Sequence, residues 1–115
     1  MAINLRHAII ADNAGNLPQD EPVLTDGREA YFSTLPVRRM TEAISAASLP
    51  AQLSYSAGVY VCNDLLYSLL AHFDQTPTRV TFIHIPYMTE QGKLPSMELC
   101  DMVRGLTIAI EAITN

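Results

Sequence analysis

The stretch Ser54-Tyr55-Ser56-Ala57-Gly58-Val59-Tyr60-Val61-Cys62-Asn63-Asp64 joins a strand-like segment to a helical pattern and decides the predicted fold. Gly58 supplies the turn between them, because a residue without a Cβ adopts positive φ at little cost. The helical pattern reaches about Phe73, so Cys62 is predicted in the first turn of a helix. Free backbone N–H groups and the positive end of the helix dipole favour an anion there, and the reactive form of a thiol is the anion. Cys62 is therefore a candidate nucleophile.

Outward from this stretch, strand and helix patterns alternate. Residues 51–55 read as a strand, and an earlier helix is expected after a cap at Ser33 or Thr34, with Pro36 in its first turn and Pro50 at its end. Its apolar face is formed by Val37, Met40, Ile44 and Ala47. The helix that carries Cys62 is expected to bury Val61, Leu65, Leu66, Leu69, Leu70 and Phe73.

The C-terminal part continues this alternation. Residues 79–85 are the most strand-like run, which Pro86 terminates, and Pro95-Ser96 is expected to open the last helix. Its buried side is predicted to contain Leu99, Met102, Val103, Leu106, Ile110 and Ile113. Cys100 is interpreted as a core residue near that face, so that only Cys62 is predicted at a helix start.

The expected fold class is a layered α/β fold, a three-layer α/β/α sandwich that is incomplete because the strands are few. Residues 1–115 are treated as a single partial domain. Residues 1–33 form a strand and a loop with a hairpin arm that closes near Ala30-Tyr31-Phe32, and residues 34–115 alternate helix and strand.

His84 is the second candidate for chemistry, since it lies near the end of the predicted strand 79–85. In open α/β sheets, functional groups gather beyond the carboxyl ends of the strands. If the two strands are parallel neighbours, Cys62 and His84 share an edge, and such a pair is the minimum for a thiol nucleophile with a general base. Two alternatives remain: a buried cysteine that packs as a small hydrophobe, and a histidine satisfied by backbone hydrogen bonds near Pro86.

Composition argues against several classes of function. The net charge of −5 without a basic cluster disfavours nucleic acid as a partner. No apolar run approaches the roughly 20 residues of a membrane span, and no signal peptide is recognisable, so a cytoplasmic protein is expected. The His and Cys spacing fits no metal motif, and no glycine-rich phosphate loop occurs, so neither a metal site nor a nucleotide site is expected. Hydrophobic residues make up 49% and charged residues 17%, which predicts apolar surface covered by further chain or a partner subunit.

Two motifs carry a family resemblance. Ser56-Ala57-Gly58-Val59-Tyr60-Val61-Cys62-Asn63, followed by Phe82-Ile83-His84-Ile85-Pro86, resembles the pyroglutamyl peptidase I family (pyrrolidone-carboxylate peptidase). In that family, the Cys of A-G-x-[FY]-V-C-N is the nucleophile and the His of F-I-H-[VI]-P is its base. Further matches are Ala2-Ile3-Asn4-Leu5, Asp12-Asn13-Ala14-Gly15-Asn16, Tyr31-Phe32-Ser33-Thr34-Leu35-Pro36 and Leu94-Pro95-Ser96-Met97.

The resemblance implies a cysteine peptidase that removes N-terminal pyroglutamyl residues from peptides through an acyl-enzyme. Cys62 would be the nucleophile and His84 the base. Ile10, Tyr60 and Val61 match positions that line the pocket for the lactam ring. The family uses no cofactor, is cytoplasmic and commonly forms a homotetramer, so a homo-oligomer is expected.

The resemblance covers only the C-terminal half of the family domain. The family's third catalytic residue, a Glu that orients the His, belongs just before the segment matched by Ala2-Ile3-Asn4 and is expected to be missing here. Ile9 replaces a usual Arg, Ala11 a usual Pro, and Asp64 a common His. The alternative function is therefore a truncated, catalytically inactive protein that acts only as a structural or oligomerisation module.

Overall fold

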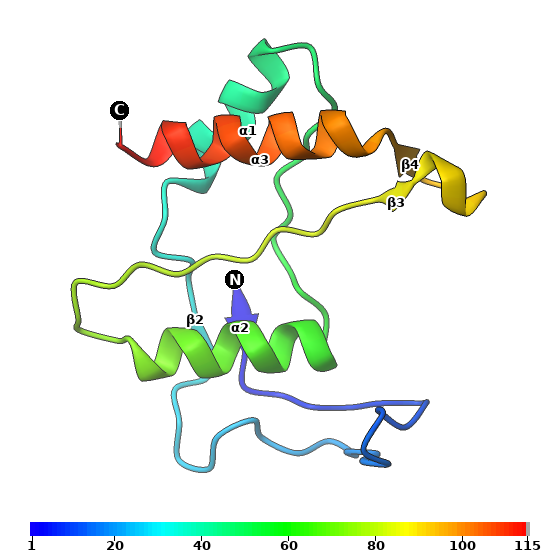
Figure 1. The fold of residues 1–115 in the computed structure, drawn as a ribbon. Helices are drawn as coiled ribbons and strands as arrows, with labels where there is room; N and C mark the ends of the chain where they lie inside the picture. Colours follow the sequence, from blue (N-terminus) through cyan, green and yellow to red (C-terminus); the bar gives the residue numbers. More distant parts are fainter. Residues whose placement is uncertain (115) are drawn as a thin grey trace. The chain divides into compact units, whose positions relative to one another are not determined.

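The computed structural model of the chain describes residues 1–114. They form two compact units, of which the first contains Met1–Leu35 and Ser54–Phe82 and the second contains Pro36–Leu53 and the residues from Ile83 onward. Each unit has its own strand pair and its own helix packing (Figure 1).

The first unit is built from a short antiparallel strand pair and one helix. Strand β1 (Ala2–Ile3) pairs with β2 (Ala30–Tyr31), and helix α2 (Val61–His72) packs against both strands. The segment between the strands returns along itself, with a further antiparallel bridge between Arg6 and Glu21. Ala30 and Tyr31, near which the hairpin arm is predicted to close, are the residues that pair with β1.

The core of the first unit lies between α2 and the strand pair. Its buried residues are Ala2, Leu66, Tyr67, Leu70 and Val80. Tyr67 is completely buried, its hydroxyl donates a 2.6 Å hydrogen bond to the carbonyl oxygen of Arg28, and its ring meets that of Tyr31 edge-on at 5.2 Å. Burial of these apolar side chains is the main stabilising contribution to the free energy of folding of such a small unit.

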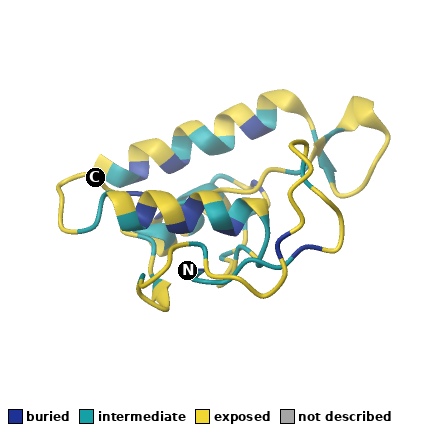
Figure 2. Cartoon of the chain, turned by 90° about the horizontal axis from the view of Figure 1, so that it is seen from below, coloured by how far each residue is buried: buried dark blue, intermediate teal, exposed yellow. Residues whose placement is uncertain are grey.

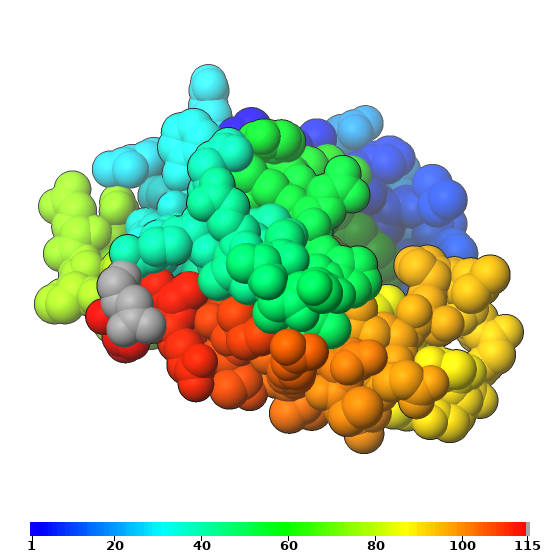
Figure 3. Space-filling view, turned by 90° about the horizontal axis from the view of Figure 1, so that it is seen from above, coloured from blue at the N-terminus to red at the C-terminus, as the bar shows by residue number. Residues whose placement is uncertain are grey.

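The second unit is built around two antiparallel helices, α1 (Val37–Ala46) and α3 (Leu99–Thr114), whose side chains pack together (Figure 3). Gly105 lies at this contact, where a Cβ would be in ordinary van der Waals contact, 3.8 Å from side-chain atoms of Ile44 and Leu49. Two arginines join opposite helix ends: Arg39 donates to the carbonyl of Ile113, and Arg104 donates to the carbonyl of Ala47, each at 3.3 Å. Cations at helix C-termini are favoured by the helix dipole.

A short parallel strand pair lies before α3 in the second unit. Strand β3 (Tyr87–Met88) pairs with β4 (Ser96–Met97), and the 3₁₀ helix η1 (Thr89–Gln91) lies between them. This pairing uses the residues that were expected to open the last helix. The prediction that Pro95-Ser96 starts that helix is therefore wrong, and α3 begins at Leu99.

Neither of the two central predicted strands is formed within residues 1–114. Residues 51–55 and 79–85 belong to no strand ladder. An apolar run predicts an extended segment, but a strand also requires a neighbour that supplies a ladder of hydrogen bonds. Val80 instead exchanges hydrogen bonds with Thr34, whose N–H donates at 2.9 Å and whose hydroxyl accepts from the Val80 N–H at 2.7 Å.

The same contact explains why the predicted cap of the first helix is wrong. The Thr34 hydroxyl is bound to Val80, and the Ser33 hydroxyl accepts a hydrogen bond from Thr81. Pro36 is the N-cap residue of α1 instead, without a side-chain cap. The helix ends at Ala46, before Pro50, because Ser48 adopts a left-handed conformation with φ of 64°.

The predicted buried stripes are only partly correct, as the burial colours of α2 and α3 show (Figure 2). On α2, Leu66 and Leu70 are buried, whereas Val61, Leu65 and Leu69 are exposed. On α3, Met102 is buried and Leu106 and Ile113 are partly buried, whereas Leu99, Val103 and Ile110 are exposed. Cys100, predicted in the core, is also exposed. Both helices are apolar around most of their circumference, so periodicity alone did not identify the covered face.

Candidate active site

The start of α2 has the geometry that the sequence predicts. Gly58 has φ of 78°, which confirms the turn that needs a glycine. Tyr60 is the N-cap residue, α2 begins at Val61, and Cys62 is its second residue. No side chain caps this helix start, so the N–H groups of the first turn are available to an anion. Cys62 is partly exposed, which a nucleophile requires and a core cysteine would not show.

Asn63 fixes this helix start to the strand pair. Its side chain is completely buried. Its Oδ1 accepts a 3.0 Å hydrogen bond from the Ile3 N–H, and its Nδ2 donates to the carbonyl oxygens of Ile3 at 2.8 Å and Leu5 at 3.2 Å. A buried amide with its donors and acceptor satisfied holds its neighbours in one geometry, because breaking the bonds leaves unpaired polar groups.

A second contact joins Tyr60 to the segment that carries Ile10. The Tyr60 hydroxyl donates a 2.7 Å hydrogen bond to the carbonyl oxygen of Ile10, and the His7 N–H donates a 2.9 Å bond to the carbonyl of Val59. Two of the three predicted pocket residues are thus in direct contact. Ile10 and Val61 are 72% and 51% exposed, which leaves apolar surface accessible on both sides of this contact.

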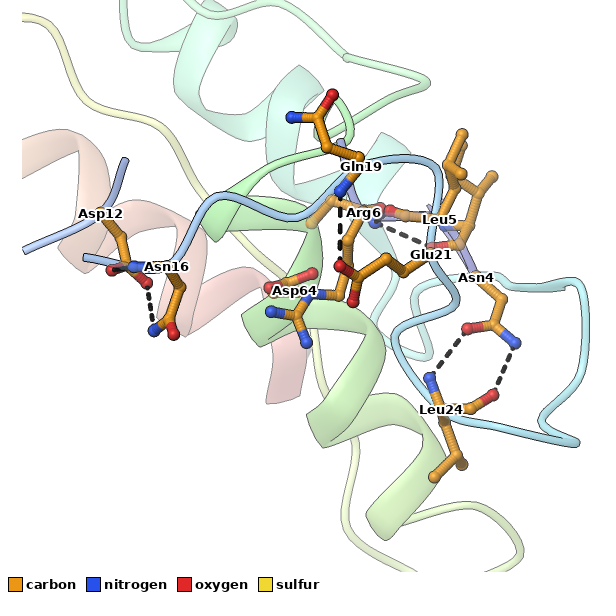
Figure 4. A network of polar contacts seen from close by, with 11 residues as sticks. Asn4, Leu5, Arg6, Asp12, Asn16, Gln19, Glu21, Leu24 and Asp64 are labelled. Carbon is orange, nitrogen blue, oxygen red and sulfur yellow. Dashed lines mark hydrogen bonds and ion pairs between the residues drawn. The ribbon is translucent and has the colours of Figure 1, made fainter. Parts of the chain in front are cut away.

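Asp64 and Arg6 form an ion pair in the first turn of α2 (Figure 4). The Arg6 Nε lies 3.2 Å from Asp64 Oδ2, and Asp64 Oδ1 is buried without a hydrogen-bond partner among residues 1–114. Burial raises the pKa of the Asp64 carboxyl above its usual value, since it penalises the charged form, while Arg6 acts in the opposite direction. Asp12 and Glu21 add to the rise in this pKa. Arg6 therefore offsets part of a negative charge that lies two residues from Cys62.

His84 belongs to the second unit, whereas Cys62, Tyr60, Val61 and Ile10 all belong to the first. It is exposed and lies in the extended segment before β3, not at the end of a formed strand. The pairing of Cys62 with His84 remains a prediction.

The structure also changes the interpretation of the second cysteine. Cys100 is the second residue of α3, the same helical position that Cys62 occupies in α2. The prediction that only Cys62 lies at a helix start is therefore wrong, since the start of α3 was placed several residues too early. A helix N-terminus alone does not distinguish the two thiols. The surroundings do, because Cys62 is followed by the buried Asn63 and Cys100 by the partly exposed Asp101.

Sequence reasoning missed two residues of this site, Asn63 and Arg6. For Asn63 the signal is its position two residues before the apolar run that starts at Leu65, where a polar side chain can reach the core only through a buried polar contact. Arg6 gave no such signal, because its partner Asp64 is 58 positions away in the sequence and only the fold brings them together.

No three His, Cys, Asp or Glu side chains within residues 1–114 are grouped so that they could hold a metal ion. In the same range, the longest apolar helices fall short of what is needed to cross a membrane.

Comparison with known sequences shows which proteins this chain resembles. The profile of the family described as Pyroglutamyl peptidase matches residues 1–115. A pyrrolidone-carboxylate peptidase of Alkaliphilus oremlandii is 51% identical over 118 aligned positions, which cover 97% of this chain and 55% of that protein. The chain spans about half the length of the curated relatives it matches.

Solved structures give the same result for the fold. The pyroglutamyl peptidase I of Bacillus amyloliquefaciens superposes with a TM-score of 0.90 at 41% identity, over 97% of this chain and 57% of that one. The pyrrolidone carboxyl peptidase of Thermococcus litoralis gives a TM-score of 0.89 at 35% identity, over 98% of this chain and 56% of that one. The predicted fold class, an incomplete sandwich of this type, is confirmed.

Proposed function

Because the chain belongs to the pyroglutamyl peptidase family, we propose that it carries the nucleophile-bearing part of a cysteine peptidase that removes N-terminal pyroglutamyl residues from peptides. The observation that supports this most directly is the position of Cys62. Its thiol is partly exposed at an uncapped helix start inside the matched region.

The proposed reaction is acyl transfer in two steps. The Cys62 sulfur attacks the carbonyl carbon of the pyroglutamyl residue, a C–S bond forms, and the amide C–N bond breaks. His84 takes the thiol proton and returns it to the departing amine. Water then hydrolyses the thioester and releases pyroglutamate and the free thiol. The free N–H groups in the first turn of α2 are suitable donors for the negative charge on the carbonyl oxygen in both steps.

The proposed binding surface for the lactam ring is formed by Ile10, Tyr60 and Val61. The ring is small, flat and neutral, so an apolar surface with a few backbone hydrogen bonds suits it. The Tyr60 hydroxyl is bound to the Ile10 carbonyl, so the tyrosine offers its ring face rather than its hydroxyl. The exposed side chains of Ile10 and Val61 support the same role.

Cellular setting and assembly are also proposals. Both cysteines are free thiols, which suits a reducing cytoplasm. Exposed apolar residues on α2 and α3 support a homo-oligomer. The resemblance to the family implies that this homo-oligomer is a homotetramer.

The test is release of a fluorescent amine from a pyroglutamyl amide by the purified chain. Activity that is lost in Cys62→Ala and retained in Cys100→Ser would support the proposal. The Cys100 variant is the matched control, since both cysteines occupy the second position of a helix. A folded sample without activity, or activity that survives Cys62→Ala, would contradict it and favour a purely structural role.

A further inference from the structure

Asn63 is the one fully buried polar side chain in the described part of the chain, and it directly follows Cys62. Three hydrogen bonds link it to the backbone of Ile3 and Leu5, 58 to 60 positions away. Burial of an amide among apolar residues is costly unless every polar atom is paired, and here the Oδ1 and the Nδ2 both have partners.

These bonds fix how the first turn of α2 is rotated. Successive residues of an α-helix are about 100° apart around the axis, because a turn contains 3.6 residues. Asn63 is held toward β1 and the core. Cys62, the preceding residue, therefore lies about 100° around the helix axis from the core-facing side, where it is partly exposed. Rotation or fraying of this turn would break all three hydrogen bonds of Asn63 at once.

Contacts on either side of Cys62 strengthen the same attachment. Val59 accepts a hydrogen bond from the His7 N–H, Tyr60 donates one to Ile10, and Asp64 pairs with Arg6. The segment from Ile3 to Ile10 thus contacts the helix start before and after the thiol. The Cys62 side chain itself makes no hydrogen bond or ion pair with residues 1–114, so its position depends on its neighbours.

We propose that Asn63 is the positioning residue of Cys62: its buried amide holds the first turn of α2 so that the thiol is presented to the free N–H groups of the helix and to the substrate. This rests on the proposed role of Cys62 as the nucleophile. It also predicts that two cysteines at the same helical position differ in reactivity, since Cys100 is followed by Asp101, whose side chain forms no hydrogen bond or ion pair within residues 1–114.

The chain offers a matched structural control in Asn4. Its side chain also makes three hydrogen bonds, accepting from the Leu24 N–H at 2.9 Å and donating to the carbonyls of Leu24 at 2.9 Å and Gly27 at 3.4 Å. It belongs to the same unit, and its side-chain hydrogen bonds go to Leu24 and Gly27 rather than to residues 59–64. Asn4→Ala therefore removes a comparable set of side-chain hydrogen bonds and leaves the three hydrogen bonds of Asn63 in place.

The experiment compares the rates at which iodoacetamide alkylates Cys62 and Cys100, measured by peptide mass spectrometry between pH 6 and 9. In the unmodified chain, Cys62 is expected to react faster than Cys100. In Asn63→Ala, the ratio of the two rates is expected to fall about tenfold, and the pH profile of Cys62 to approach that of Cys100. Asn4→Ala is expected to change the ratio less than twofold. If Asn63→Ala does not fold, Asn63→Asp replaces it, because it keeps the acceptor for the Ile3 N–H.

An unchanged ratio in a folded Asn63 variant would overturn the proposal, as would an equal fall in Asn4→Ala, which would show a general loss of stability. Alkylation needs no peptidase turnover, so the two proposals fail separately. If only the proposed function is wrong, the chain is inactive and the alkylation rate of Cys62 still depends on Asn63. If only the positioning role is wrong, the chain is active and the alkylation rate of Cys62 does not depend on Asn63.

Discussion

The hydroxyl of Tyr60 and the carbonyl oxygen of Ile10 are joined by a 2.7 Å hydrogen bond across fifty positions of sequence. The bond connects the N-cap residue of α2 to a loop in which Ile9 and Ile10 are both strongly exposed. Exposed loop backbone is mobile unless something holds it. Tyr60 therefore determines where this apolar loop lies relative to Cys62.

We expect Tyr60→Phe to loosen the loop while it keeps the aromatic ring. One hydrogen bond contributes about 0.5–1.5 kcal/mol, so amide hydrogen exchange in residues 9–16 should accelerate about two- to tenfold. Mass-spectrometric hydrogen exchange measures this directly. Thr107→Val, which removes a 2.8 Å bond on the exposed side of α3, is the control and should leave the loop unchanged. Equal hydrogen exchange in Tyr60→Phe and in the unmodified chain would contradict the view that the Tyr60–Ile10 hydrogen bond holds the loop.

The second prediction concerns Gly27, which packs against the Tyr67 hydroxyl. A Cβ at this position would lie 2.5 Å from that oxygen and 3.1 Å from Leu24. The hydroxyl cannot move away without losing its bond to the Arg28 carbonyl. Gly27→Ala should therefore lower the free energy of unfolding by about 1–3 kcal/mol, as overpacking does in well-packed cores.

A double-mutant cycle tests the cause of this loss. In a Tyr67→Phe background the oxygen is absent, so Gly27→Ala should cost clearly less than in the unmodified chain. Urea unfolding of the four proteins gives the coupling. If the cost of Gly27→Ala is the same in both backgrounds, the contact with the hydroxyl is not responsible.

The third prediction is a pH dependence that originates at Asp64. Burial raises the pKa of this carboxyl, so the folded state holds the proton more tightly than the unfolded chain does. Its contribution to stability is complete below the ordinary value of 3.8 and is lost as pH rises through the raised pKa. Relative to the unmodified chain, Asp64→Asn should gain free energy of unfolding as pH increases from about 4 to 7.

Asp12, in the same unit, is expected to give a pH dependence of stability opposite to that of Asp64. Hydrogen bonds from Asn16 and Ala14 lower the pKa of its carboxyl, the side-chain bond from Asn16 most of all. Its contribution is present above 3.8 and is lost as pH falls through the lowered pKa. Asp12→Asn should therefore flatten the acid side of the stability profile, and Asp64→Asn the side toward neutral pH. Parallel profiles for the two variants would contradict both assignments.

Local sequence signals predicted the turn and the helix around Cys62 better than they predicted the sheet. The turn at Gly58, the helix start before Cys62 and the end of α2 near Phe73 follow from backbone preferences of a few adjacent residues, and all are found. The strands at 51–55 and 79–85 depend on neighbouring strands that local pattern cannot supply, and no ladder forms within residues 1–114.

The contacts that organise the site depend on the fold rather than on spacing. Asn63 reaches Ile3 and Leu5, Tyr60 reaches Ile10, and Arg6 reaches Asp64, each across at least fifty positions. Such pairs leave no periodic trace in a single sequence. The prediction that Cys100 does not lie at a helix start is wrong for a related reason. The pairing of β3 with β4 uses Ser96 and Met97, so α3 begins at Leu99.

The last prediction uses two adjacent leucines of α2 as a matched pair. Leu65 is 51% exposed and Leu66 is 4% exposed, although the sequence pattern placed both in one buried stripe. Truncation of a buried leucine leaves a cavity, so Leu66→Ala should lower the free energy of unfolding by about 2–5 kcal/mol. Leu65→Ala removes little buried area and should cost less than about 0.5 kcal/mol. Urea unfolding over a range of protein concentrations measures both, with Leu69→Ala as a second exposed position. A large loss in Leu65→Ala that grows with protein concentration would show that a second copy covers this side of α2, whereas a large loss independent of concentration would show that Leu65 is buried within the chain itself.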